Sequence, residues 1–145
     1  MDDSRTTSGY RSHSGLEVLS DEDCLCLLST VPVGRLVYTH GGLPVVRLVD
    51  FVVDGDTIVF ATHDDTKRRA AVRGDVVAFE ADSFDLEQRL RWTVTVIGHL
   101  SAVSPGEAAE FSGHLDELGG PGSLIRLGIE SIHGRRSPGR AQTDR

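Results

Sequence analysis

The chain has 145 residues, enough for one domain with a substantial core, and its 15 Lys and Arg against 22 Asp and Glu give a net charge of −7. This acidic balance argues against non-specific binding to nucleic acid or to an anionic membrane surface. No apolar run approaches the ~20 residues of a membrane-spanning helix, and the N-terminus lacks the basic and apolar regions of a secretory signal. The sequence therefore predicts a soluble, cytoplasmic protein.

The chain begins with a polar stretch followed by a short helix. Residues 1–16 lack hydrophobic periodicity, which predicts a disordered arm ahead of a domain spanning residues 17–136. Ser20 is a suitable N-cap, the acidic residues after it complement the helix dipole, and Pro32 ends the helix. Residues 137–145 are polar and predict a flexible C-terminal tail.

Six β-rich segments make up most of the domain. Two apolar runs joined by Asp54-Gly55-Asp56 predict a hairpin, while one helix is expected from 65 to 72 before Gly74 and another from Pro105 to Leu118. Most connections are short turns, whereas a doubly wound sheet needs a helix after nearly every strand. The pattern therefore predicts a mainly β fold with short helices, an antiparallel barrel of six strands. The expected strands are 33–39, 44–53, 57–62, 75–82, 90–103 and 123–133.

The helix start that follows the hairpin suggests an anion site. Asp65 is the expected N-cap, and the Thr66 hydroxyl, the Lys67 cation and the free N–H groups of the first turn together suit a phosphate. A lysine here faces the positive end of the helix dipole, a penalty that a bound anion would remove. Thr66 and Lys67 are therefore candidate phosphate ligands, with an ordinary solvated helix start as the alternative.

Two charged residues interrupt the apolar strand before this helix. Arg47 shares a strand face with apolar neighbours, so a buried guanidinium would need a carboxylate or an anionic ligand as partner. Asp50 lies on the opposite face, where it either accepts hydrogen bonds from a ligand or forms a polar rim of the barrel. Both residues are candidate binding residues.

The sequence offers little support for metal or nucleophilic catalysis. The six histidines are scattered without the spacing of a helix-borne metal site, and no Gly-x-Ser-x-Gly motif is present. Cys24 and Cys26 have no further ligand candidates close in sequence and are predicted to be buried apolar thiols. No catalytic side chain and no metal ligand is therefore predicted.

The order of these segments resembles the pyridoxamine 5′-phosphate oxidase-like family of flavin-binding split barrels. The resemblance spans about residues 18–136, and the order and spacing of its pieces are more specific than any one of them. The segments that carry it are Val33-Gly34-Arg35-Leu36, Pro44-Val45-Val46, Asp54-Gly55-Asp56-Thr57-Ile58-Val59-Phe60, Lys67, Ala70 to Glu80, Trp92-Thr93-Val94, Gly98-His99-Leu100 and Ile132-His133-Gly134-Arg135-Arg136.

The resemblance implies a homodimeric, six-stranded split β-barrel with FMN in the groove between subunits. Trp92 would flank the flavin ring or come from the partner subunit, although a core or interface anchor is the alternative for this residue. The chain departs from the family pattern in carrying carboxylates near the phosphate position. The implied cofactor-binding residues are Arg47, Leu48, Val49, Asp50, Ala61, Thr62, His63, Thr66, Lys67 and Trp92.

Three functions are compatible with these features. The first is an FMN-dependent oxidoreductase acting on an unidentified small molecule, with the cofactor performing the chemistry. The second is a deazaflavin-dependent reductase, for which Arg68, Arg69 and Arg73 could contact a longer anionic tail. The third is a non-catalytic barrel that binds a flavin or another ligand, because a fold alone does not establish an activity.

Overall fold

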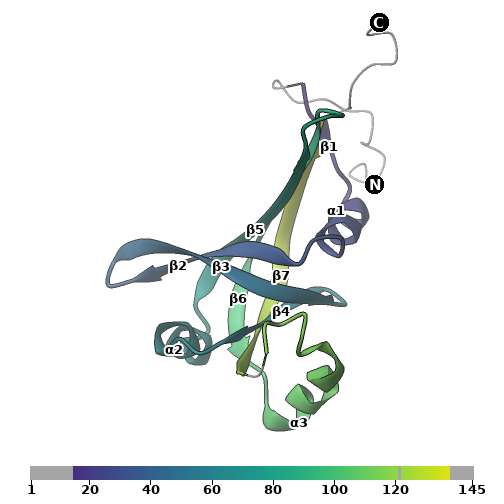
Figure 1. Cartoon of the computed structure of the whole chain (residues 1–145). Helices are drawn as coiled ribbons and strands as arrows, with labels where there is room; N and C mark the ends of the chain where they lie inside the picture. Colours follow the sequence, from purple (N-terminus) through teal and green to yellow (C-terminus); the bar gives the residue numbers. More distant parts are fainter. Residues whose placement is uncertain (1–14, 121, 138–145) are drawn as a thin grey trace, which may run out of the picture.

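The computed structural model describes residues 15–120 and 122–137 and shows a mainly β fold with a few short helices (Figure 1). The predicted arm at residues 1–16 and tail at 137–145 fall almost entirely outside the described residues. The strands are β1 (Glu17–Val18), β2 (Val33–His40), β3 (Leu43–Asp54), β4 (Thr57–Thr62), β5 (Val76–Asp85), β6 (Leu90–Ala102) and β7 (Ser123–Arg136). The helices are α1 (Asp21–Leu28), α2 (Asp65–Arg73), α3 (Pro105–Ala108) and the 3-10 helix η2 (Ala109–His114).

Six of these strands close into an antiparallel barrel, as the sequence predicted. The pairing order is β7-β4-β3-β2-β5-β6, and β6 pairs again with β7 to complete the ring. The strand β1, which the sequence did not predict, adds two residues to the edge of β7 through the pairs Glu17–Arg136 and Val18–Arg135. Closure leaves most strand edges paired, which is how small antiparallel barrels avoid open edges.

The barrel splits where β3 and β4 separate. The two strands pair only from Phe51–Phe60 to Asp54–Thr57, although their register would continue into residues before Phe51 and after Phe60. Beyond that point β3 stays with β2 alone, and the β2–β3 hairpin extends sideways above α2 (Figure 1). Short stretches of backbone edge on β3 and on β4 are thereby left facing each other across a gap.

The interior of the barrel is tightly packed. Phe51 meets Phe79 edge-on with ring centroids 4.9 Å apart, and both rings are buried. Gly34 is required beside this pair, because a β-carbon there would lie 2.2 Å from the Phe79 ring. β4 is buried on both faces, with Ile58 and Phe60 inside the barrel and Val59 in a second, outer cluster. This double burial explains why β4 is a continuous apolar run.

The outer cluster fixes the segment that follows η2. Phe111 and Leu118 pack with Val59 and Leu124 against the outside of the barrel. The helix predicted from Pro105 to Leu118 is correspondingly wrong in part: only α3 is α-helical, and the chain continues as η2 and then turns. Anchoring by Leu118 brings the turn after it close to the split between β3 and β4.

Two local predictions need correction. The connection expected between the strands 75–82 and 90–103 is shorter, because β5 continues to Asp85, which pairs with Leu90 at the end of the β5–β6 hairpin. Cys24 is buried as predicted, and burial raises the pKa of its thiol to about 11, but Cys26 is exposed. Among the described residues, no helix is long and apolar enough to cross a bilayer.

Candidate functional site

The start of α2 is built by a set of short-range hydrogen bonds. Asp64, not the predicted Asp65, is the N-cap, and its carboxylate accepts from the Thr66 N–H at 2.8 Å. The Asp64 N–H in turn donates to Thr62 Oγ1 at 2.9 Å, which ties the helix start to the end of β4. These bonds hold the pKa of Asp64 below its ordinary value, chiefly through the Thr66 N–H. At the other end, Gly74 adopts the left-handed conformation that ends the helix.

Lys67 is buried in the first turn of α2, with 8% of its surface exposed. Within the part of the chain that the structure describes, it forms no ion pair with a carboxylate. Burial lowers the pKa of Lys67, the charge of Asp64 partly opposes that shift, and the charge of Arg47 adds to it. A buried cation repelled by a second cation is unfavourable without an anion nearby.

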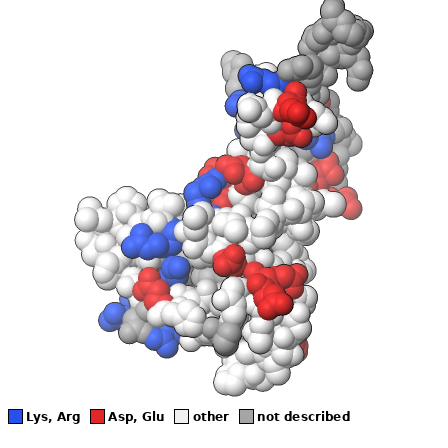
Figure 2. All heavy atoms as spheres, viewed as in Figure 1, with Lys and Arg blue, Asp and Glu red and all other residues white. Residues whose placement is uncertain are grey.

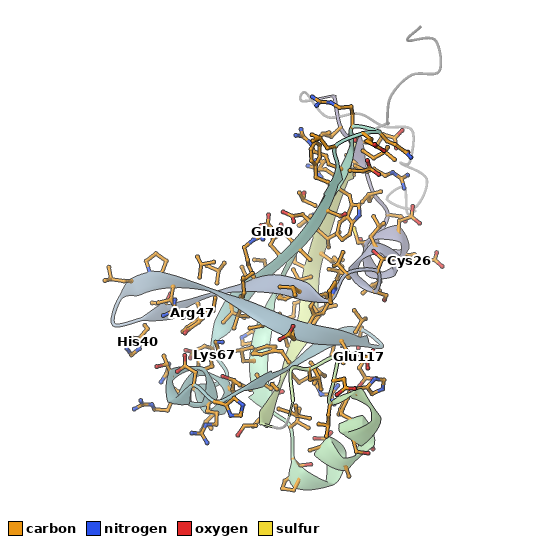
Figure 3. The ribbon with its side chains drawn as sticks, in the orientation of Figure 1. Cys26, His40, Arg47, Lys67, Glu80 and Glu117 are labelled. Atoms are coloured by element: carbon orange, nitrogen blue, oxygen red, sulfur yellow. The ribbon has the colours of Figure 1, made fainter. Side chains whose placement is uncertain are left out.

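Arg47 lies opposite Lys67 on the part of β3 that extends beyond the barrel (Figure 3). Its guanidinium donates to the Val46 carbonyl at 3.0 Å and, among the described residues, makes no ion pair. The expectation that Arg47 is buried is wrong, because the hairpin leaves the barrel before this residue and the side chain is exposed. The sequence missed Tyr38, a buried residue of β2 whose pKa is raised by burial and by the charge of Asp64.

A cavity of about 420 Å³ lies at the split between β3 and β4. Asp50 lines it from β3, Ala61 and Thr62 from the end of β4, and Lys67 from α2. The structure thus brings together five of the ten residues predicted to bind a cofactor, because these five lie where β3 separates from β4 or in the segment that follows β4. The complete lining is Asp50, Ala61, Thr62, His63, Asp64, Lys67, Leu118 and Gly119.

The far wall of this cavity was not predicted from the sequence. Gly119 has a φ of 81° and lies so close to Asp50 that a β-carbon would be 2.8 Å from the Asp50 carboxylate. Leu118 holds this turn in place through the outer apolar cluster. In the sequence, Gly119-Gly120 follows directly after the helix predicted to end at Leu118, a pattern that indicates the end of a helix rather than the wall of a site.

The remaining predicted residues occupy different surroundings. Leu48 is exposed beside Arg47, whereas the side chain of Val49 is buried in the barrel core. Thr66 is half-buried and contributes its backbone N–H to Asp64. Trp92 lies far along the barrel, opposite Arg136 on β7, where it lines a small hollow with Leu27 and other residues. Within one chain, Trp92 therefore does not join the cavity.

Charge is distributed unevenly around the cavity. Figure 2 shows Lys and Arg side chains over the β3 and α2 side of this face, and a group of acidic side chains toward α3, near the Glu117 labelled in Figure 3. Across the described ranges, no group of three or more His, Cys, Asp or Glu side chains is arranged to hold a metal ion. The geometry suits a ligand with an anionic group placed between Arg47 and Lys67.

Comparison with known proteins gives matches in one family. The family model described as pyridoxamine 5′-phosphate oxidase matches residues 20–136. A protein of Mycobacterium tuberculosis, "Uncharacterized protein Rv0080", is 36% identical over 109 residues, which cover 72% of this chain and 71% of the relative.

The fold recurs in solved structures of other proteins. The FAD binding protein from Mycobacterium smegmatis superposes with a TM-score of 0.65 and 31% identity, over 83% of this chain and 97% of that one. A Corynebacterium glutamicum protein, described provisionally as a pyridoxamine 5′-phosphate oxidase, superposes with a TM-score of 0.72 over 87% of this chain and 96% of that one. Its sequence identity is 24%, so this likeness supports the shared fold only. The match of the family model over most of the domain shows that this chain belongs to the pyridoxamine 5′-phosphate oxidase-like family of split barrels.

Proposed function

We propose that this protein is a homodimeric, FMN-dependent oxidoreductase that acts on a small molecule. The observation that carries the proposal is the buried Lys67, which faces a cavity and Arg47 without a carboxylate partner among the described residues. An anion between the two cations would relieve their repulsion and offset the desolvation of Lys67. The flavin-binding relative from M. smegmatis supports a flavin as the source of that anion.

The residues present fit the phosphate end of a flavin. Lys67 and Arg47 supply positive charge at the start of α2, where the Thr66 N–H already donates to the Asp64 carboxylate. Asp64 is turned back to cap α2 through the Thr66 N–H, so its charge is partly satisfied within the helix start. A flavin phosphate can therefore bind near Asp64, because the Asp64 carboxylate already accepts a hydrogen bond as the cap of α2.

The split edges of β3 and β4 are suited to holding the polar rim of the ring system. Backbone groups near Val49, Ala61 and Thr62 lie where the two strands no longer pair with each other. Asp50 offers an acceptor for ribityl hydroxyl or ring N–H donors. When bound, a flavin supplies hydride or electron transfer, so the side chains of this cavity need only bind and orient it.

A second subunit would complete the site. Leu48 is 68% exposed beside the cavity, and Leu43, Val46 and Phe84 are also exposed apolar side chains on protruding hairpins. In the proposed dimer another copy of the chain covers these residues, and Trp92 of that copy flanks the flavin, as the family resemblance implies. Stable dimers bury more than about 1,200 Å² in total.

The absorption spectrum of the purified protein, followed by titration with cofactors, tests the proposal. Bound flavin absorbs at roughly 450 nm and deazaflavin at roughly 420 nm, because the cofactor determines the chromophore. A colourless protein that binds neither added FMN nor FAD would contradict the proposal and favour a non-catalytic barrel. Light scattering tests the dimer independently, since a monomeric mass would contradict shared sites.

The deazaflavin alternative depends on the basic face of α2. Arg68, Arg69 and Arg73 were the predicted contacts for a longer tail, but Arg73 is paired with Asp75 at 2.7 Å. The Arg73 cation is therefore already used within the protein. A preference for deazaflavin over FMN in the same titration would reverse this assignment.

A further inference from the structure

Asp64 lines the cavity beside Lys67, the cation that the proposed function assigns to a ligand phosphate. A carboxylate next to a lysine would ordinarily pair with it and cancel the positive charge that an anionic ligand needs. Among the described residues, however, the two side chains form no ion pair, and the charge of Asp64 only partly opposes the lowering of the Lys67 pKa by burial. The site therefore depends on what holds the Asp64 carboxylate away from Lys67.

Hydrogen bonds with three residues hold Asp64 in place. Its carboxylate accepts from the Thr66 N–H at 2.8 Å, and its own N–H donates to Oγ1 of the buried Thr62 at 2.9 Å. The third partner is Tyr38, whose hydroxyl is hydrogen-bonded to the Asp64 side chain. Thr62 and Thr66 are neighbours of Asp64 in the chain, whereas Tyr38 comes from β2 and ties the helix start to the β2–β3 hairpin.

The register of the hairpin places Tyr38 on the face that carries Arg47. Tyr38 pairs with Val45 and Leu36 pairs with Arg47, so these side chains alternate onto the same face of the two strands. Tyr38 is 4% exposed, and burial, followed by the charge of Asp64, raises the pKa of its hydroxyl. The hydroxyl therefore keeps its proton at neutral pH and serves as the donor to Asp64.

We infer that Tyr38 is a positioning residue of the anion site, which holds the Asp64 carboxylate at the cap of α2 and so leaves Lys67 available to a ligand phosphate. Without the Tyr38 hydroxyl, the carboxylate gains more by turning toward the buried ammonium, and the resulting pair neutralises the site. This inference rests on the proposed phosphate site and deepens it. It explains how a carboxylate and a phosphate-binding cation line the same cavity.

NMR of the full-length protein without ligand tests the inference directly. Lys67 is the only lysine in the sequence, so isotope-labelled lysine gives one side-chain signal whose titration reports the Lys67 pKa. Tyr38→Phe should raise this pKa, because the released Asp64 carboxylate stabilises the ammonium. The nearby charges of Arg47 and Asp50 are the same in both proteins. Adding Asp64→Asn should abolish the rise, since asparagine still caps a helix but carries no charge.

Titration of the same variants with FMN and riboflavin measures the consequence for binding. Tyr38→Phe should lower FMN affinity about tenfold and change riboflavin affinity by less than about twofold, because a charge-assisted contact to the phosphate is lost. The double variant Tyr38→Phe/Asp64→Asn should bind FMN as tightly as Asp64→Asn alone. Melting temperatures of all variants confirm folding.

Two results would overturn the inference. One is an unchanged Lys67 pKa in Tyr38→Phe, and the other is the same loss of FMN affinity with and without Asp64→Asn, since Tyr38 would then act by packing alone. The NMR titration needs no flavin, so it separates this inference from the proposed function. A wild-type protein that binds neither FMN nor riboflavin, with the expected rise in the Lys67 pKa, would contradict the proposed function and leave the role of Tyr38 standing.

Discussion

The barrel interior and the cavity at its split share strands but differ in how their polar and charged groups are satisfied. Phe51 and Phe79 pack edge-on within the hydrophobic core, and Gly34 leaves room for the Phe79 ring beside the backbone. One residue before Phe51, Asp50 faces an open space with Lys67, a cation that burial disfavours. The interior is an apolar core within one chain, whereas the cavity is lined by the buried cation Lys67 and the carboxylates of Asp50 and Asp64. The comparison teaches that buried charge, rather than shape alone, identifies the site.

The largest effect is expected from removing the central ring of the interior. Phe79→Ala should lower the free energy of unfolding by about 3–5 kcal/mol, because Phe79 is fully buried and its neighbours can close the space only in part. Chemical denaturation followed by Trp92 fluorescence measures this loss. A loss below about 1 kcal/mol would mean that the interior is not packed as described.

A smaller loss of stability is expected at Gly34, where the packing leaves no room for a side chain. Gly34→Ala should destabilise the fold by about 1–3 kcal/mol, since the new methyl group would overlap the Phe79 ring. Gly113→Ala is the matched control, because nothing lies within 4 Å of a β-carbon there. If the two substitutions have the same effect in denaturation, the close approach of Gly34 is not a constraint.

On the cavity side, Asp64 is the residue whose structural role is clearest. Asp64→Ala should cost about 0.5–2 kcal/mol through loss of the α2 cap. The pKa of Asp64 is lowered in the folded protein, so its contribution is present above the ordinary value of 3.8 and disappears as pH falls through the lower folded pKa. Denaturation of the wild type and of Asp64→Asn between pH 2 and pH 6, roughly the range over which such carboxyls titrate, should therefore show a steeper acid loss in the wild type. Parallel curves would contradict this assignment.

The smallest expected change is a gain in the stability of the ligand-free protein when the buried cation Lys67 is removed. Lys67→Met should raise the free energy of unfolding by about 1 kcal/mol at neutral pH, the lower end of gains seen when buried charges become apolar. Folding lowers the pKa of Lys67, so the unfolded chain keeps its proton longer and wild-type stability rises as pH approaches 10.5. The advantage of the variant should shrink over that range. A destabilised variant at neutral pH would show that Lys67 already has a partner in the free protein.

The sequence predicted the barrel well because its signals are local. The Asp54-Gly55-Asp56 turn and the apolar runs around it locate β3 and β4, and the family resemblance pointed to Asp50, Ala61 and Thr62. The site was harder to predict where it depends on distant segments. Gly119 reaches Asp50 only because Leu118 packs on the outside of β4, and no local pattern encodes that contact. Arg47 was placed in the wrong environment because strand alternation does not reveal where a hairpin leaves the barrel.

The most direct test of the central claim compares the affinities of FMN and riboflavin for the wild type and Lys67→Ala. If Lys67 contacts the flavin phosphate, the substitution removes about 1.5–3 kcal/mol and FMN affinity falls roughly ten- to hundredfold. Riboflavin, which lacks the phosphate, should bind both proteins equally. Arg69→Ala, an exposed residue on the same helix outside the cavity, should leave both affinities unchanged. Equal losses for FMN and riboflavin, or no loss for either, would contradict a phosphate site at Lys67.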